Sequence, residues 1–207
     1  MTPDPAAAAP PFFALVRSDL RQLAKLKEGA SSIATRLWLI DVLMLPGAWA
    51  GILWRAGTTL HARGIKPLSR ICYFLNVVLF GAELSTGAIL DEGMATPHPV
   101  GVTIASGSQF GKRCRVMGKV SIGGSGNPGA EGHPVIGDDV WIFDAARVFG
   151  PVKIGDRSII GAGVTVTRDI PADSFVTLDS GVRIRSLEEV GLETHGGSLD
   201  GGAGRWS

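Results

Sequence analysis

A six-residue repeat constrains this chain more than any other feature of its sequence. Aliphatic residues recur every six positions through the second half, and small or β-branched residues recur four places after each of them. The clearest run is Ile136, Ile142, Val148, Ile154, Ile160 and Val166. This period fits neither a helix nor the alternation of a single strand. It is typical of a β-solenoid with triangular rungs, one hexad on each side, whose stacked rungs form a continuous core.

Two places break the repeat. The register extends back to Leu84, so we expect the solenoid to begin near Glu83, and we place a two-residue excess between Val102 and Phe110. The second break is the segment 123–134, GGSGNPGAEGHP, which contains five glycines and cannot form a regular rung. A long excursion from a rigid scaffold is a natural place for function, and a tolerated surface loop is the alternative.

The rest of the sequence predicts a mainly β protein that has an α-helical region before its solenoid. We expect a disordered N-terminus over residues 1–12, helices over 13–81, the β-helix over 82–178 and a flexible C-terminal tail over 179–207. The expected helices are Ala14–Lys27, Arg36–Met44, Ala48–His61 and Leu68–Phe80. Pro46-Gly47 separates the second from the third, and a turn at Gly64 and Pro67 separates the third from the fourth.

The segment Leu37–Trp54 is strongly apolar and raises the question of a membrane. A spanning helix needs about 20 apolar residues, and Asp41, Pro46 and Gly47 interrupt this run. We expect a buried helix pair or an oligomer contact here, with peripheral membrane contact as the alternative. Charged residues fall where the apolar part of a secretory signal should begin, so we expect a cytoplasmic protein.

Composition excludes several classes of protein. The formal net charge of +1 does not suggest a nucleic-acid partner. Cys72 and Cys114 do not form the framework of a disulfide-rich fold, and Cys114 occupies an inward position of its hexad. The four histidines are scattered without the spacing of a zinc site, so we expect no metal.

Two histidines beside prolines are the candidate catalytic residues. His98 lies between Pro97 and Pro99, which stiffen the backbone around it, and His133 precedes Pro134. The two histidines are 35 positions apart, little more than one rung once the excursion is removed. We therefore expect both near one edge of the prism, or facing one another across a subunit interface. Imidazoles suit proton transfer near neutral pH, whereas either one alone is equally a surface histidine without a role.

Glu83 is the candidate partner of His98. It lies 15 positions before His98, close to the length of one rung. A carboxylate at that separation can accept a hydrogen bond from the far ring nitrogen of the imidazole and fix its tautomer. A solvated charge at the first corner is the alternative.

Together these motifs resemble the hexapeptide-repeat acyltransferases with a left-handed parallel β-helix, and most of all the serine O-acetyltransferases. The resemblance covers about residues 36–178 and includes the excursion from Ser121 to Pro134. It implies that acetyl-coenzyme A is the donor substrate and that His98 is the general base. It further implies that Glu83 stands at the family's paired aspartate and that His133 is the second active-site histidine.

The resemblance also implies how the substrate and the subunits are held. Active sites lie in grooves between the prisms of a homotrimer, and two trimers can pair through their helical regions. The coenzyme A-binding residues that the resemblance implies are Gly123, Gly124, Asp144, Ala162 and Arg168.

Three departures from the family bear on the acceptor. Pro97 stands where the family has an aspartate, Gly132 stands where it has a carboxylate-binding arginine, and the family's acidic Asp-Pro pair of the helical region has no counterpart before Ala34. Charge-assisted contacts of that kind are the strong ones. A further departure, Phe143-Asp144 in place of a Gly-Ala pair, bears on the contacts with coenzyme A and on the donor. We therefore expect an O-acetyltransferase that acts on the hydroxyl of a sugar or another small molecule. The alternatives are a serine O-acetyltransferase of cysteine biosynthesis and a non-catalytic β-helix scaffold.

Overall fold

The computed structural model describes residues 11–28, 42–126, 131–178, 193–195 and 198–200. The chain forms two units, Met1–Thr177 and Leu178–Ser207. The second unit holds one antiparallel pair of strands, β14 (Glu193–His195) and β15 (Ser198–Asp200). The disorder expected over residues 1–12 and the helix expected over Arg36–Met44 lie mostly outside the described residues.

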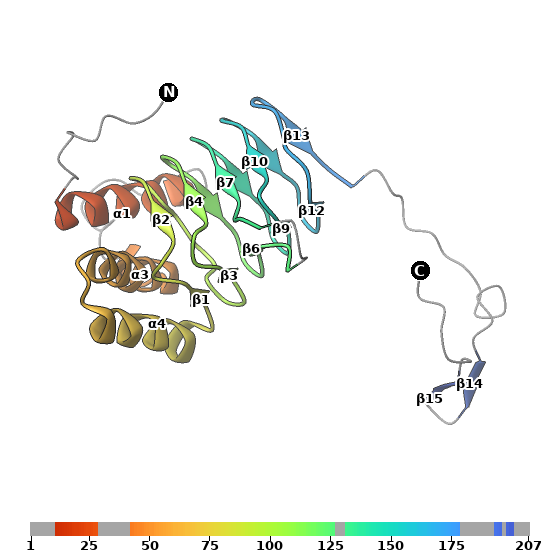
Figure 1. Ribbon diagram of the computed structural model, residues 1–207, viewed down its shortest axis with the longest axis horizontal. Coiled ribbons are helices and arrows are strands. Elements are labelled where there is room, and N and C mark those ends of the chain that lie inside the picture. The colour runs from red at the N-terminus through yellow and green to blue at the C-terminus, as the bar shows by residue number, and fades with distance from the viewer. Residues whose placement is uncertain (1–10, 29–41, 127–130, 179–192, 196–197, 201–207) are drawn as a thin grey trace. The chain divides into compact units, whose positions relative to one another are not determined.

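Three helices precede the strands: α1 (Phe12–Glu28), α3 (Pro46–Ala62) and α4 (Lys66–Phe80). A proline in the first turn favours the start of both α3 and α4. Gly81, with φ of 60°, ends α4 in the left-handed conformation. Figure 1 shows these helices grouped at the end of the strand stack where the first rung begins.

The strands form a parallel β-helix with three sides, which we name A, B and C (Figure 1). The chain visits the sides in turn, and neighbouring strands on each side are parallel. Side A contains β1 (Glu83–Leu84), β3 (Thr103–Ile104), β6 (Ser121–Gly123), β9 (Arg147–Phe149) and β12 (Thr165–Val166). Side B contains β2 (Ile89–Leu90), β4 (Gln109–Phe110), β7 (Val135–Ile136) and β10 (Lys153–Ile154). Side C contains β5 (Arg115–Val116), β8 (Trp141–Ile142), β11 (Ile159–Ile160) and β13 (Phe175–Val176).

The prism interior is the apolar core that the repeat predicts. The second residue of most strands is fully buried, and the small residue four places later is buried as well. Cys114 is 1% exposed and belongs to this core, where burial raises the pKa of its thiol to about 12. Helix α3 closes the first end of the core, because Trp54 packs edge to face on Phe110 with ring centroids 6.2 Å apart. The Trp54 indole donates a hydrogen bond of 2.8 Å to the Ser85 carbonyl.

Strand register locates the first break in the repeat. Ala95 pairs with Arg115, twenty positions later, whereas Thr103 pairs with Ser121, eighteen positions later. Two extra residues therefore lie between Ala95 and Thr103. They form a bulge at the corner between sides C and A, and His98 lies on that bulge.

The expectation of an excess between Val102 and Phe110 was wrong. Ile104 and Phe110 are six positions apart and both point into the core, so that hexad is regular. The second break lies where the sequence predicts it, since Gln109 pairs with Val135, twenty-six positions later. The glycine-rich excursion therefore adds eight residues to its rung.

Charged residues form the corner between sides B and C. Arg113, Asp139, Arg157 and Asp173 all adopt positive φ of 56° to 58°, a region that side chains rarely occupy. The Arg113 Nε donates to Asp139 Oδ1 over 2.7 Å, and the Arg157 Nε donates to Asp173 Oδ1 over 2.6 Å. At this corner, ion pairs therefore link residues of left-handed conformation on successive rungs.

A buried ion pair joins the helices to the solenoid. The Asp19 carboxylate of α1 accepts two hydrogen bonds of 2.9 Å from the Arg55 guanidinium of α3. Arg55 also donates to the carbonyls of Leu90 and Asp91, and the Met94 amide donates to Asp19. Burial raises the pKa of Asp19 to about 6, although the Arg55 charge acts in the opposite direction. Three parts of the chain thus meet at one polar cluster.

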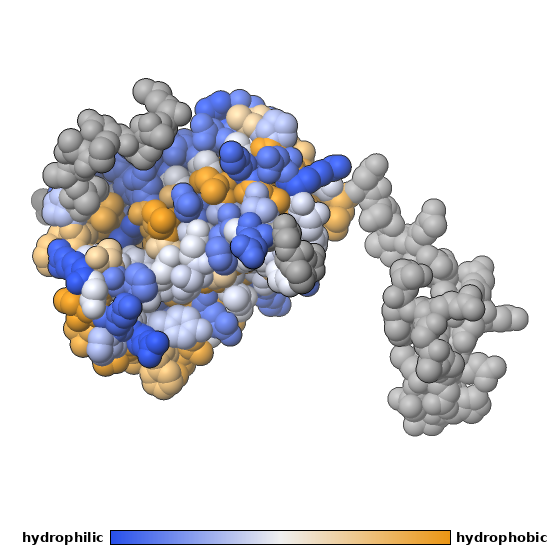
Figure 2. Space-filling view, viewed as in Figure 1, coloured by the Kyte–Doolittle hydropathy of each residue, from blue (hydrophilic) through white to orange (hydrophobic). Residues whose placement is uncertain are grey.

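The apolar surface of the helical region lies mainly on α4. Figure 2 shows apolar residues gathered over this helix. Among the described residues, no helix is both long enough and apolar enough to cross a membrane.

The Asp19 ion pair predicts how stability depends on pH. Folding raises the pKa of this carboxyl from 3.8 to about 6, so the folded state binds an extra proton between those values. Its contribution to the free energy of unfolding therefore falls as pH rises from about 4 to about 6, by roughly 3 kcal/mol in total. We therefore expect the unfolding free energy of the native chain minus that of Asp19→Asn to fall between about pH 4 and about pH 6. Urea titration of both proteins at several pH values measures this difference.

Asp173→Asn is the matched control at an exposed ion pair. Hydrogen bonds from Arg157 lower the pKa of Asp173, so its stabilising contribution is present above the unfolded pKa and is lost as pH falls. We expect the native-minus-variant difference to rise with pH, weakly because solvent screens the pair. If the difference for Asp19→Asn also rose from pH 4 to 6, the attraction of Arg55 would outweigh burial.

Candidate active site

The edge between sides C and A carries His98, Asp144 and Ala162, all of them exposed. Gly118 lies between the first two: a Cβ added to it would lie 3.5 Å from the His98 Cβ and 3.2 Å from the Asp144 Oδ1. The Gly163 amide donates to the Asp144 carbonyl, so Ala162 belongs to the next rung along the same edge. The absence of a side chain at Gly118 therefore leaves room for the Asp144 carboxylate beside the backbone and Cβ of His98.

The backbone before His98 is held from inside the molecule. Thr96 and Pro99 are buried on either side of the bulge. A Cβ on Gly47, at the start of α3, would overlap the Thr96 carbonyl and lie 2.9 Å from the Pro97 carbonyl oxygen. Because α3 packs directly on this backbone, the bulge presents His98 from a fixed support.

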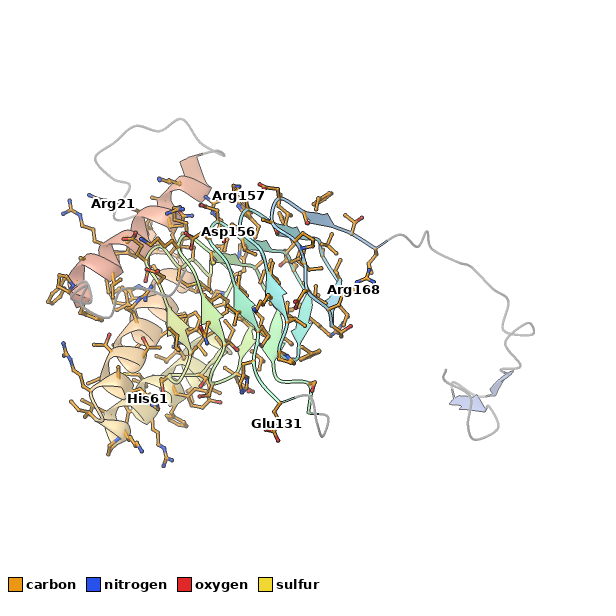
Figure 3. The ribbon with its side chains drawn as sticks, turned by 45° about the horizontal axis from the view of Figure 1, so that its top comes forward. Arg21, His61, Glu131, Asp156, Arg157 and Arg168 are labelled. Atoms are coloured by element: carbon orange, nitrogen blue, oxygen red, sulfur yellow. The ribbon has the colours of Figure 1, made fainter. Side chains whose placement is uncertain are left out.

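The edge between sides A and B carries the second histidine. A Cβ on Gly107, whose φ is 86°, would lie 2.7 Å from the His133 Cδ2, and one on Gly124 would lie 3.6 Å from its Cε1. The imidazole of His133 thus lies close to two residues without side chains. Gly123, the last residue of β6, is buried, and Gly124 follows it. Arg168 follows β12 and is exposed at the same edge (Figure 3).

Side A separates the two edges. The chain from Gly118 to Gly124 passes through a turn at Lys119 and then along β6, so it crosses the whole of side A. In one chain His98 and His133 therefore lie on different edges, and the expectation of a shared edge was wrong. The estimate from spacing failed because the excursion adds eight residues rather than twelve and because His98 itself lies on a bulge. The alternative, two histidines that face one another across a subunit interface, stays a prediction.

Glu83 lies on side A at its first rung. Its backbone pairs with Thr103, five positions beyond His98, and its side chain is exposed. Within the described ranges no hydrogen bond joins Glu83 to His98, and their pairing stays a prediction. Glu83 opens a column of outward-facing polar residues in register: Glu83, Thr103, Ser121, Arg147 and Thr165. The face between the two histidine edges is therefore polar.

A surface groove of about 480 Å³ lies on side B, and its lining includes Val135, Lys153 and Asp169. It adjoins the edge of His133 rather than that of His98. No group of three or more His, Cys, Asp or Glu residues in the described part of the chain is placed to hold a metal ion. Gly107 and Gly118 matter to this geometry, but the sequence does not single them out, because glycine is common at every corner of the β-helix.

A three-sided parallel β-helix of six-residue repeats, with exposed histidines on two of its edges, defines the class of hexapeptide-repeat transferases. A family model described as "Bacterial transferase hexapeptide (six repeats)" matches residues 133–168. The serine acetyltransferase of Synechococcus elongatus is 32% identical over 162 residues, 75% of this chain and 66% of that protein. That of Mycobacterium tuberculosis is 31% identical over 161 residues, 78% of this chain and 68% of that protein.

A solved structure extends the likeness to three dimensions. Serine acetyltransferase isoform 3 from Entamoeba histolytica, in complex with cysteine, superposes with a TM-score of 0.71 at 26% identity, over 86% of this chain and 63% of that one. The left-handed parallel β-helix is thereby confirmed. The chain belongs to the serine acetyltransferase family. It spans about two thirds of the length of these relatives.

Proposed function

We propose that this protein is an acetyl-coenzyme A-dependent O-acetyltransferase that uses His98 as its general base. The observation that carries the proposal is the bulge of His98, where an exposed imidazole stands on a fixed support at an otherwise regular corner. Membership of the serine acetyltransferase family supports the reaction class. A scaffold without catalysis would not require a proline-flanked histidine at a break in the repeat.

The chemistry requires a base because an alcohol is too weak an acid to attack a thioester unaided. His98 takes the hydroxyl proton as the oxygen attacks the acetyl carbonyl, and Glu83 stabilises the imidazolium. The Gly124 N–H and His133 supply hydrogen bonds to the developing oxyanion. The imidazolium then returns the proton to the leaving thiolate. The raised pKa and burial of Cys114 argue against a thiol nucleophile at this step.

Two chains are needed to assemble these groups, because one chain holds them on opposite edges of side A. We propose a homotrimer in which His98, Asp144 and Ala162 of one chain face Gly124 and His133 of the next. Coenzyme A lies along this groove and contacts Gly123, Gly124, Asp144, Ala162 and Arg168. The compartment we propose is the cytoplasm.

The acceptor follows from Gly132 and Pro97. Gly132 has φ of 128°, and a Cβ there would lie 2.9 Å from the Pro151 Cβ, so an arginine in this conformation has no room. The backbone of Pro97 is packed against Gly47, and its ring supplies no charge for an α-amino group. These two positions favour the hydroxyl of a sugar or an amino alcohol over serine. Serine remains the second candidate, because the relatives are serine acetyltransferases.

Replacement of His98 tests the proposed base. We expect His98→Ala to lower the rate of thiol release from acetyl-coenzyme A by about 10²–10⁴-fold, because the hydroxyl keeps its proton during attack. His61→Ala, at an exposed histidine of α3, is the matched control and should retain the native rate. Thiol release that is unchanged in His98→Ala would remove the proposed mechanism.

Mixing two inactive variants tests the site between chains. We expect co-expression of His98→Ala and His133→Ala chains to restore activity, because a native His98 edge then meets a native His133 edge in some trimers. Random assembly leaves about a quarter of the sites intact in a closed ring. Thiol release is compared with that of each variant expressed alone. Activity no higher than the separate variants would contradict a shared site.

A panel of acceptors distinguishes the two candidate substrates. We expect thiol release to be faster with sugars or amino alcohols than with L-serine at equal concentration. A carboxylate without a charged partner at position 132 loses a charge-assisted contact, a loss of roughly 10-fold or more. Turnover with serine that exceeds every other acceptor would establish the second candidate.

A further inference from the structure

Helix α4 presents an apolar ridge to solvent over its whole length. Its residues Leu68, Ile71, Phe74, Val78 and Leu79 are 50% to 63% exposed, and Ile65 just before it is 45% exposed. Ile71, Phe74 and Val78 follow the three- and four-residue spacing of one helix face. Isolated exposed apolar residues are ordinary, but a contiguous patch of this kind marks a contact with a partner.

The buried face of α4 anchors the helix along that length. Ser69 donates a hydrogen bond of 2.7 Å to Thr86 of the first rung. Asn76 is fully buried and donates to the Ala50 carbonyl of α3. The helix is therefore held by both α3 and the solenoid (Figure 1).

Positive charge accompanies the ridge, and no acidic residue lies within α3, α4 or the turn between them. Arg63, Lys66 and Arg70 are exposed at the first end of α4, and no described residue forms an ion pair with them. The sequence from Pro46 to Phe80 contains neither Asp nor Glu. A basic, apolar helix surface of this type suits an anionic layer.

We propose that α4 docks the protein on the surface of an anionic lipid bilayer. The apolar ridge enters the boundary between headgroups and acyl chains, while Arg63, Lys66 and Arg70 contact the headgroup phosphates. The helix lies parallel to the membrane plane and does not cross it.

A lipid fits this surface better than a protein partner does. The ridge residues offer no polar side chain, whereas protein interfaces carry about one hydrogen bond for every 100–200 Å². A second copy of the same surface would bring three further positive charges and no acid to balance them. An acyl layer needs no directional partner, and the anionic headgroups provide the counter-charge.

Vesicle sedimentation of the full-length protein tests the proposal. We expect co-sedimentation with phosphatidylcholine vesicles that contain phosphatidylglycerol, weaker binding at high salt, and little binding to phosphatidylcholine alone. The charge-reversal variant Arg63→Glu/Lys66→Glu/Arg70→Glu should lower the partition coefficient by roughly 100-fold or more. The variant Ile71→Ser/Phe74→Ser should lower it as well, although it keeps every charge.

Lys153→Glu/Phe175→Ser is the matched control, with one charge reversed and one exposed aromatic removed from the β-helix. It should bind vesicles as the native chain does. Light scattering of each variant gives its oligomeric mass. The proposal would be overturned if both α4 variants bound anionic vesicles as strongly as the native chain. It would also be overturned if the native chain did not bind them. A fall in oligomeric mass in the α4 variants without vesicle binding would assign the ridge to a second copy of the chain.

Discussion

The stacking of one rung on the next is the constraint on which the rest of this structure depends. Each strand is only two or three residues long and can bury its aliphatic side chain only between the rungs on either side. Any departure from the six-residue period must therefore leave the prism at a corner, since an extra residue inside a strand would turn every later side chain outward. Both long departures in this chain do so, and each carries a histidine.

The first end of such a stack needs a cap, and here the cap also positions the proposed site. Trp54 closes the core, while the Asp19–Arg55 pair binds α1 and α3 to the backbone of the first rung. That backbone runs from Asp91 through Met94 directly into the bulge of His98, where Gly47 packs against it. A buried ion pair is weak support for stability as such, because desolvation offsets its attraction. Its geometry nevertheless links the placement of His98 to the packing of the helices.

The core could be predicted from the sequence, because inward and outward positions alternate within every hexad. The site could be predicted only in part. His98, His133 and Gly124 depart from the pattern and are visible as such, but the edge on which each lies depends on where the extra residues enter. Val102 and Ile104 both suit an inward position, so spacing alone placed the excess after Val102, beyond His98 rather than beside it. The Asp19–Arg55 pair and the ridge of α4 depend on how helices pack, which periodicity does not encode.

The glycines beside the two histidines bear on the proposed acceptor. At Gly107 and Gly118 the missing side chain makes room for an imidazole or a carboxylate, whereas at Gly132 the positive φ and the contact with Pro151 exclude any longer side chain. The charge that a carboxylate-binding arginine would supply is thus absent, and Asp144 adds a negative charge near His98. In the proposed site, this polarity disfavours an acceptor carboxylate and is consistent with the proposed neutral or cationic acceptor. If α4 holds the chain at a lipid surface, the acceptors it meets first are those present at that surface.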